Sequence, residues 1–150
     1  MFDFLGDDDT IDAPRFRVAL RLRGDTLDPD FLTQQLGLAP SFSARKGDGD
    51  SDHAPGGNTG IWTYHLPLAE ETELGSVVEQ LLSLFPGDAT LWEELTSTYT
   101  TDVCCAVHLQ GDHQRTALDA EVLAALGRRG LALRIELHAP GTDGGDDDEA

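Results

Sequence analysis

The chain has 150 residues, with 28 acids against 10 bases and a formal net charge of -18. A chain of this length can form one domain with a substantial core. Its negative charge argues against nucleic acid and anionic membranes as partners, because both bind through clustered positive charge. The sequence has no apolar run long enough to cross a membrane, and it lacks the basic start and apolar core of a secretory signal. We therefore expect a cytoplasmic protein.

The acids are concentrated at the two ends of the chain. Residues 1–14 and 140–150 each hold five of them, and Asp/Gly-rich segments bury too little apolar surface to offset the entropy of ordering. We expect acidic, disordered tails at 1–14 and 140–150 and a single α+β domain at 15–139. Within that domain Cys104 and Cys105 are adjacent. This spacing suits neither a disulfide nor a zinc site and is typical of a reducing compartment.

A short pattern occurs twice in the chain, at residues 19–32 and 106–123. Each copy reads as a strand that ends in Gly-Asp, followed by Leu-Asp and an amphipathic helix. The pattern predicts two related β-α units in which each part has a physical role: positive φ at the strand ends, N-caps and C-caps. Positive φ is expected at Gly24 and Gly111, the N-caps at Asp28 and Asp119, and the C-caps at Gly37 and Gly127.

Between the two copies, "GIWTYHLP" predicts a strand that closes a β-hairpin over roughly residues 41–66. Thr72 is expected to cap an amphipathic helix that ends at Pro86-Gly87, and Asp88 to begin a further turn or two. "LALRIELHA" then predicts the last strand. This order predicts an α+β fold, with a ferredoxin-like βαββαβ core and an added αβ unit. We expect an antiparallel or mixed sheet with helices on one face and the other face open.

Alternation along the strands assigns side chains to the open face. Phe16, Val18, Leu20 and Leu22 form the apolar side of the first strand, so its arginines lie on the opposite side. The candidate binding residues of this face are Arg15, Arg17, Arg21, Arg23, His108 and Arg134. Two interpretations remain open: a solvated sheet face, or a platform for an anion or a protein, since arginine makes bidentate contacts and is enriched at interfaces.

Metal binding is not expected from the motifs that could suggest it. His65, His108 and His138 could share a metal only if their strands were adjacent, and no carboxylates accompany them in the sequence. Asp48, Asp50 and Asp52 match the first positions of an EF-hand loop. However, histidine and threonine occupy the positions that need glycine and glutamate. The sequence also contains no recognisable nucleophile motif, so we expect no cofactor and no enzymatic activity.

Arg45 and Lys46 precede this loop, and Lys46 is the chain's single lysine. With Gly47 they could form a ligand cradle, a partner contact or a structural turn that leads towards Trp62. A glycine allows the backbone conformations that a tight turn requires, and a tryptophan can be placed by packing in the core. The structural turn is therefore the favoured interpretation, with Arg45, Lys46 and Trp62 retained as candidate binding residues.

The segments "LRGDTLDPDFLTQQLGLAPSFSARKGD", "GIWTYHL" and "LDAEVLAALGRRGLALRIELHA" resemble a bacterial family known as domain of unknown function 4279. The matching residues are Leu36, Gly37, Pro40, Lys46, Gly47, Asp48, Gly60 and Trp62. The resemblance spans about residues 16–139 and implies no activity. By analogy with other small proteins of this kind, the resemblance suggests an immunity partner in a toxin system.

Two functions are compatible with these observations. The first is a non-enzymatic protein-binding module, such as an immunity-type inhibitor whose acidic surface covers a basic active site. The alternative is a sensor that binds a small anion on the arginine-lined sheet face. Both predict a partner other than nucleic acid or a membrane.

Overall fold

The computed structural model describes residues 15–47, 59–67, 73–111 and 114–139. The expected tails, the capping by Thr72 and most of the acidic hairpin loop lie outside these residues. The elements are β1 (Arg15–Gly24), α2 (Pro29–Leu36), β2 (Phe42–Ala44), β3 (Gly60–His65), α3 (Leu74–Ser83), α4 (Ala89–Thr98), β4 (Thr100–His108), α5 (Ala120–Arg128) and β5 (Ala132–His138).

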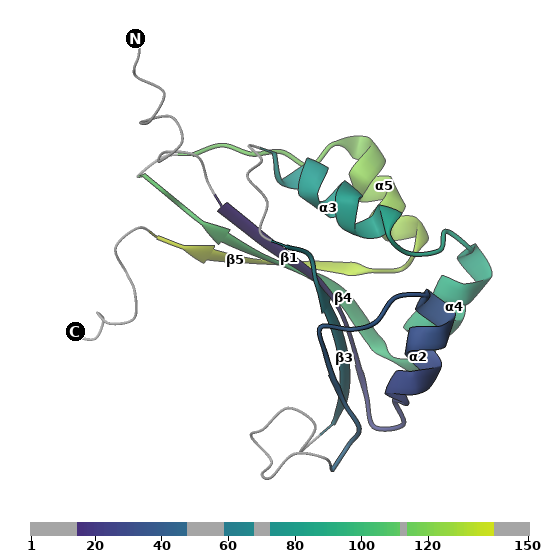
Figure 1. Cartoon of the computed structure of the whole chain (residues 1–150). Coiled ribbons are helices and arrows are strands. Elements are labelled where there is room, and N and C mark those ends of the chain that lie inside the picture. Colours follow the sequence, from purple (N-terminus) through teal and green to yellow (C-terminus); the bar gives the residue numbers. More distant parts are fainter. Residues whose placement is uncertain (1–14, 48–58, 68–72, 112–113, 140–150) are drawn as a thin grey trace.

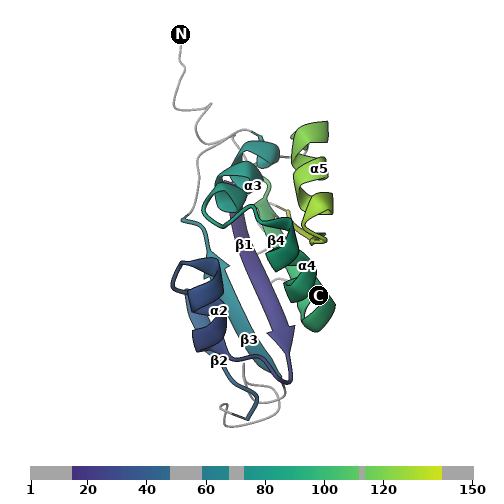
Figure 2. The same cartoon turned by 90° about the vertical axis from the view of Figure 1, so that its right-hand side faces the viewer.

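The strands form one sheet in the order β2-β3-β1-β4-β5. β1 lies in the middle and pairs antiparallel with β3 and β4, whereas β5 runs parallel to β4 at the edge. The four helices of the described residues lie on the same side of the sheet (Figure 1), and the view turned by 90° shows them in front of it (Figure 2). The α+β prediction with a mixed sheet is confirmed, and the strand order is compatible with a ferredoxin-like core extended by α5 and β5.

The core lies between the sheet and the helices. The apolar set of β1 is at most 1% exposed and packs against helix residues such as Leu32, Val78 and Leu81. Trp62 from β3 and Trp92 from α4 are fully buried. Burying large apolar side chains on one face is what stabilises a two-layer fold of this size. The other face of the sheet has no covering element among the described residues.

The first β-α unit has the expected helix caps. Asp28 accepts a hydrogen bond from the backbone N–H of Asp30 at 3.1 Å, and Gly37 ends α2 with a φ of 77°. Positive φ is inexpensive only for glycine, so this C-cap explains the residue. The prediction of positive φ at Gly24 was wrong, because Gly24 continues β1 opposite Gly60. A Cβ on Gly24 would lie 2.9 Å from the ring of Tyr99, so close packing explains this glycine.

The second β-α unit departs further from the expected pattern. Asp119 occupies the N-cap position of α5, but its side chain makes no capping hydrogen bond. Gly127 lies inside the helix and does not end it; the residue with positive φ is Gly130, in the turn before β5. Gly111 also lacks positive φ. The repeated pattern therefore predicts the order of elements correctly and the caps of only the first unit.

Two helices follow β3 where the sequence predicts one long helix and a short extension. Asp88 caps α4 by accepting from the N–H of Thr90 at 3.1 Å, and the helix continues for ten residues. Its Trp92 is buried and donates to the carbonyl of Pro86 at 2.7 Å, which fixes the break between α3 and α4. Among the described residues, no helix is long and apolar enough to cross a membrane.

β5 is covered by helices along only part of its length. Its apolar residues alternate towards the helix side, as predicted, and Leu133 packs against the core. Ile135 and Leu137, however, are 49% and 66% exposed, although their partners in β4, Cys105 and Val107, are buried. The helices therefore cover the apolar side of this strand only as far as Leu133.

Candidate functional site

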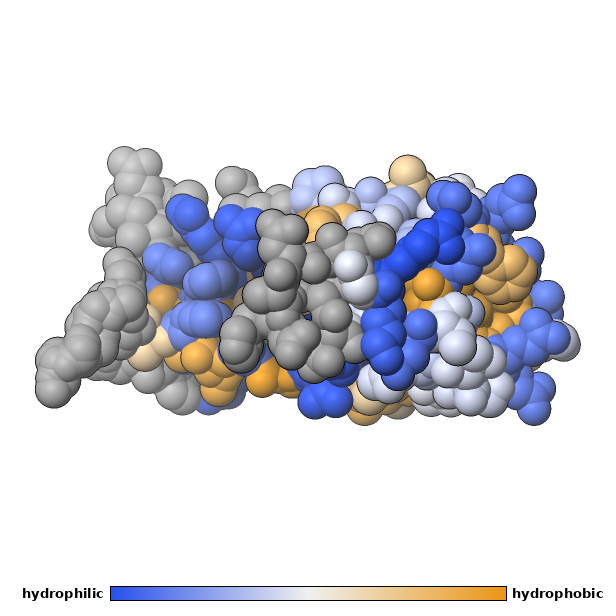
Figure 3. Space-filling view, turned by 90° about the horizontal axis from the view of Figure 1, so that it is seen from below, coloured by the Kyte–Doolittle hydropathy of each residue, from blue (hydrophilic) through white to orange (hydrophobic). Residues whose placement is uncertain are grey.

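Five arginines project from the open side of the sheet. Four come from alternate positions of β1, and the fifth comes from β5, two strands away. We call this group the arginine face; it comprises Arg15, Arg17, Arg21, Arg23 and Arg134. Strict alternation in β1 places its arginines opposite the buried apolar set. Seen from below, the surface carries strongly hydrophilic side chains with smaller hydrophobic areas between them (Figure 3).

Asp102 holds three of these arginines together. It is opposite Arg21 in the pairing of β1 with β4, and its side chain is only 1% exposed. Arg21 donates to both of its carboxylate oxygens at 3.2 Å, through Nε and Nη2. Arg134 Nε donates to Oδ2 at 2.7 Å, and Nη2 of Arg23 lies 3.6 Å from the same oxygen. A bidentate arginine contact and a short charged hydrogen bond are the strong forms of this interaction.

The arginines keep Asp102 ionised despite its burial. Burial alone raises the pKa of this carboxyl. The hydrogen bonds from Arg21, Arg134 and the Cys104 thiol outweigh that effect and bring its pKa below the usual value. The hydrogen bond to Asp102 also raises the pKa of Arg21. Asp102 therefore carries a full negative charge at neutral pH and organises the middle of the arginine face.

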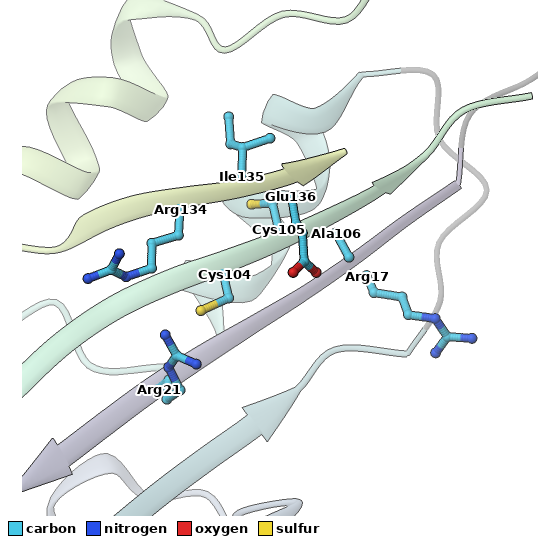
Figure 4. A pocket seen from close by; sticks show the side chains of 8 residues that line it. All are labelled: Arg17, Arg21, Cys104, Cys105, Ala106, Arg134, Ile135 and Glu136. Atoms are coloured by element: carbon cyan, nitrogen blue, oxygen red, sulfur yellow. The ribbon is translucent and has the colours of Figure 1, made fainter. Parts of the chain in front are cut away.

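A hollow of about 380 Å³ opens beside Arg21 and Arg134, two of the arginines that hold this carboxylate. We call it the central hollow; its lining includes Arg17, Arg21, Cys104, Arg134 and Glu136. Arg21 and Arg134 lie on either side of Cys104 at one end, and Arg17 extends from the other end (Figure 4). A second hollow of about 220 Å³ is lined by Arg15, Arg17, His108 and Gln110. Arg17 lines both hollows, which makes them neighbours on the same face.

The two cysteines are poor nucleophiles in this setting. Burial, together with the hydrogen bond that Cys104 Sγ makes to Asp102 at 3.3 Å, raises the pKa of Cys104 to about 11. Burial raises the pKa of Cys105 to about 12. Because the thiolate is the reactive form, neither side chain is poised for attack at neutral pH. Cys104 therefore acts as a hydrogen-bond donor within the Asp102 cluster.

His108 and His138 meet at the end of the sheet where β1 begins. Their rings stack with centroids 4.6 Å apart. His138 Nε2 lies 3.1 Å from a carboxylate oxygen of Glu136, so the expectation that no carboxylate accompanies these histidines was wrong for His138. Burial and the nearby charge of His138 lower the pKa of His108. His65 is opposite Ala19, on the other side of β1, so the three histidines do not come together. In the described part of the chain, no cluster of three or more His, Cys, Asp or Glu could hold a metal ion.

The remaining candidates lie away from the arginine face. Arg45 pairs with Asp28 at 3.1 Å and Asp30 at 3.5 Å, and Lys46 pairs with Asp25 at 3.2 Å. These contacts connect the segment after β2 to the N-terminal end of α2. Trp62 lies in the core on the helix side, fully buried, where its Nε1 donates to Thr33 Oγ1 at 3.1 Å. The structure thus does not bring Arg45, Lys46 and Trp62 together with the arginines of the sheet.

Charge is divided between the two sides of the molecule. Among the described residues, the open sheet face carries the five arginines against two carboxylates, Asp102 and Glu136. The other described acids lie on helices and turns, and they outnumber the bases there. A positive sheet face on a chain with a net charge of -18 is a local exception to its composition.

The fold and the site define a small α+β protein with an open, arginine-lined sheet face. The chain belongs to the family called domain of unknown function DUF4279, whose model matches residues 14–140. The resemblance noted in the sequence is thereby confirmed. Neither a curated protein nor a solved structure matches the chain.

Chemically, the face is suited to binding an anion. Guanidinium groups offer paired N–H donors that match the oxygens of carboxylates and phosphates. Arg15 and Arg17 are exposed and line the second hollow, and none of the described carboxylates pairs with either of them. The arginines held by Asp102 supply fixed positive charge beside them.

Proposed function

We propose that this protein is a non-enzymatic binding module whose arginine face recognises an anionic group. The observation that supports this most directly is the excess of arginine on the open face, around the central hollow. A solvated sheet face needs no such excess of one sign, and elsewhere the described chain is predominantly acidic. Arginine is the side chain best suited to hold phosphate or carboxylate oxygens in a fixed geometry.

Asp102 contributes to this function by fixing the arginines in advance. A guanidinium held by a buried carboxylate loses little side-chain freedom when a ligand binds, which reduces the entropy cost of binding. Arg21 and Arg134 are held in this way, whereas Arg15 and Arg17 extend further into solvent. The face therefore combines a rigid centre with an adaptable end.

Titration with inorganic pyrophosphate tests this proposal. We expect pyrophosphate to bind to the full chain at low salt. Calorimetry measures the affinity, and NMR of the arginine Nε–H signals shows which arginines take part. The double variant Arg15→Ser/Arg17→Ser should bind about tenfold or more weakly, because a hydrogen bond to a charged group contributes roughly 1.5–3 kcal/mol. Both side chains are exposed and make no core contact, so the fold should be unchanged.

The matched control is Arg115→Ser/Arg128→Ser. It removes the same charge from two exposed positions away from the sheet face and should bind pyrophosphate almost as well as the unmodified chain. Equal weakening in the two double variants would mean that only overall charge matters, which contradicts a site on the face. Absence of binding to pyrophosphate, phosphate and acidic peptides alike would contradict the proposal as a whole.

The acidic helix side supports a second candidate function. An immunity-type inhibitor would use the acids on the helices and turns to cover a basic active site of another protein, with electrostatic attraction speeding association. We expect a partner recovered with the protein from its host to be basic and to associate at least tenfold more slowly at high salt than at low salt. An association rate that does not depend on salt would contradict this candidate.

A further inference from the structure

The unpaired edge of β5 is the most unusual surface of the described chain. β5 has seven residues and contains no proline, and among the described strands its one neighbour is β4. Natural proteins protect such edges with prolines, bulges or charged side chains, because an open edge pairs readily with another strand. Here Ile135 and Leu137 remain 49% and 66% exposed beside it, and Leu123 of α5 is 49% exposed as well.

The backbone groups that face this edge can be identified from the pairing with β4. The carbonyl of His138 accepts a hydrogen bond from the N–H of Leu109, so the backbone groups of His138 point towards β4. These groups alternate along a strand. Those of Leu133, Ile135 and Leu137 therefore point to the open edge. The backbone groups available to a new strand thus belong to the residues with apolar side chains.

β5 is complementary to its own reversed sequence. If a second copy pairs antiparallel with Ile135 opposite Ile135, then Leu133 is opposite Leu137 and Ala132 is opposite His138. The three apolar pairs then exchange both backbone hydrogen bonds, in agreement with the direction of their backbone groups. Arg134 falls opposite Glu136 in both halves, in the close non-hydrogen-bonded positions where side-chain pairs interact most strongly.

Charge selects this register among the symmetric ones. Centring the pairing on Arg134 would place two guanidinium groups opposite each other, and centring it on Glu136 would do the same with two carboxylates. Like charges directly opposite each other destabilise a sheet. Only the register centred on Ile135 gives two ion pairs and places each of the three larger apolar residues, Leu133, Ile135 and Leu137, opposite another of them. Arg134 is 57% exposed and holds Asp102 through Nε, so its Nη groups can donate to a second carboxylate, and Glu136 is 76% exposed.

We propose that the β5 edge joins two copies of this chain into a symmetric dimer through antiparallel β5–β5 pairing centred on Ile135. The two sheets become one continuous sheet, with both arginine faces on the same side, because Arg134 lies opposite Glu136 of the other copy on that side. The exposed side chains of Ile135 and Leu137 are covered on the helix side. The contact is isologous, so it closes on itself and leaves the anion-binding face accessible.

The net charge of the chain opposes this association and makes it salt dependent. Two copies that each carry a net charge of -18 repel over distances longer than an ion pair. Salt screens this long-range repulsion while the backbone hydrogen bonds and apolar contacts remain. We expect sedimentation of the full chain to show dimer formation that increases with concentration and is stronger at moderate salt than at very low salt.

Disulfide cross-linking tests the register. Residue 135 alone lies directly opposite its own copy, so Ile135→Cys should give a covalent dimer on mild oxidation. Ala132→Cys is the matched control, because its copies would lie about 20 Å apart along the paired strands. The unmodified chain, which keeps Cys104 and Cys105, shows the background. Cross-linking of Ala132→Cys as efficient as that of Ile135→Cys would overturn the register.

Two charge variants test the same proposal without oxidation. Glu136→Arg places arginine opposite arginine in both halves, and we expect about tenfold weaker dimerisation. Glu79→Arg changes the net charge equally on exposed α3 and should leave dimerisation unchanged or slightly stronger. A monomer at all concentrations and salt conditions would overturn the dimer, whether or not pyrophosphate binds. Equal effects of the two variants would overturn the role of the ion pairs.

Discussion

Replacing Asp102 by asparagine should lower the free energy of unfolding by about 2–3 kcal/mol. Removing one partner of a fully buried ion pair costs about 3–5 kcal/mol, because the remaining charge is left without compensation. Arg21, Arg23 and Arg134 are 29%, 35% and 57% exposed and can regain water, so the expected loss is smaller. Urea unfolding measures it directly, and the melting temperature should fall by roughly 10 °C.

The stability difference between Asp102→Asn and the unmodified chain should become smaller as the pH falls. A carboxyl with a lowered folded-state pKa stabilises the fold above its unfolded-state pKa and loses that contribution as the pH falls through the folded-state value. The difference between the two proteins should therefore be constant from pH 7 to pH 5 and shrink below about pH 4. Unfolding curves at pH 7, 5 and 3 provide this comparison.

Glu79→Gln is the control for Asp102→Asn. It neutralises an exposed carboxylate on α3, away from the sheet face, and it should change stability by less than about 0.5 kcal/mol. Equal stability of Asp102→Asn and the unmodified chain would contradict the view that this carboxylate organises the arginines. A stability difference that grew at low pH would contradict the lowered pKa.

Residue alternation was sufficient to predict the arginine face. The apolar residues of β1 recur at every second position, so only one arrangement buries them, and the arginines between them have one side to occupy. The order of elements followed from the same periodicities together with the capping of α2. Local patterns that leave a single way to bury apolar surface are therefore reliable guides to this fold.

Asp102 was not predicted because its role depends on strand pairing. In the sequence it follows two threonines and could end a loop as easily as begin a strand. Only the pairing that places it opposite Arg21 and beside Arg134 makes it the centre of a cluster. A usable signal existed: Asp102 lies two residues before Cys104 and four before Ala106, so it shares their outward side.

The exposed end of β5 could not be predicted from the sequence for a similar reason. Periodicity shows which way a side chain points, but not whether a helix reaches far enough to cover it. Ile135 and Leu137 point to the helix side and are still exposed. Trp62 was retained as a binding candidate because the motif it shares with Lys46 does not show whether its ring is buried.

Replacing Trp62 by alanine should lower the free energy of unfolding by about 3–5 kcal/mol, as expected for a large aromatic side chain removed from a core. The ring is fully buried, makes an edge contact with Phe85 at a centroid distance of 6.3 Å and donates a hydrogen bond to Thr33. Marginally stable domains have about 5–15 kcal/mol in total. The alanine variant should therefore be partly unfolded in calorimetry at physiological temperature.

The milder variant Trp62→Phe separates a structural role from a binding role. It keeps an aromatic ring but loses the hydrogen bond to Thr33 and some volume, so we expect a loss of about 1–2 kcal/mol with the fold retained. Because Trp62 lies on the helix side, pyrophosphate affinity should stay within about twofold of the unmodified chain, whereas Arg15→Ser/Arg17→Ser weakens it. A folded Trp62→Phe protein that no longer bound pyrophosphate would place the anion site on the other side of the sheet and would contradict recognition by the arginine face.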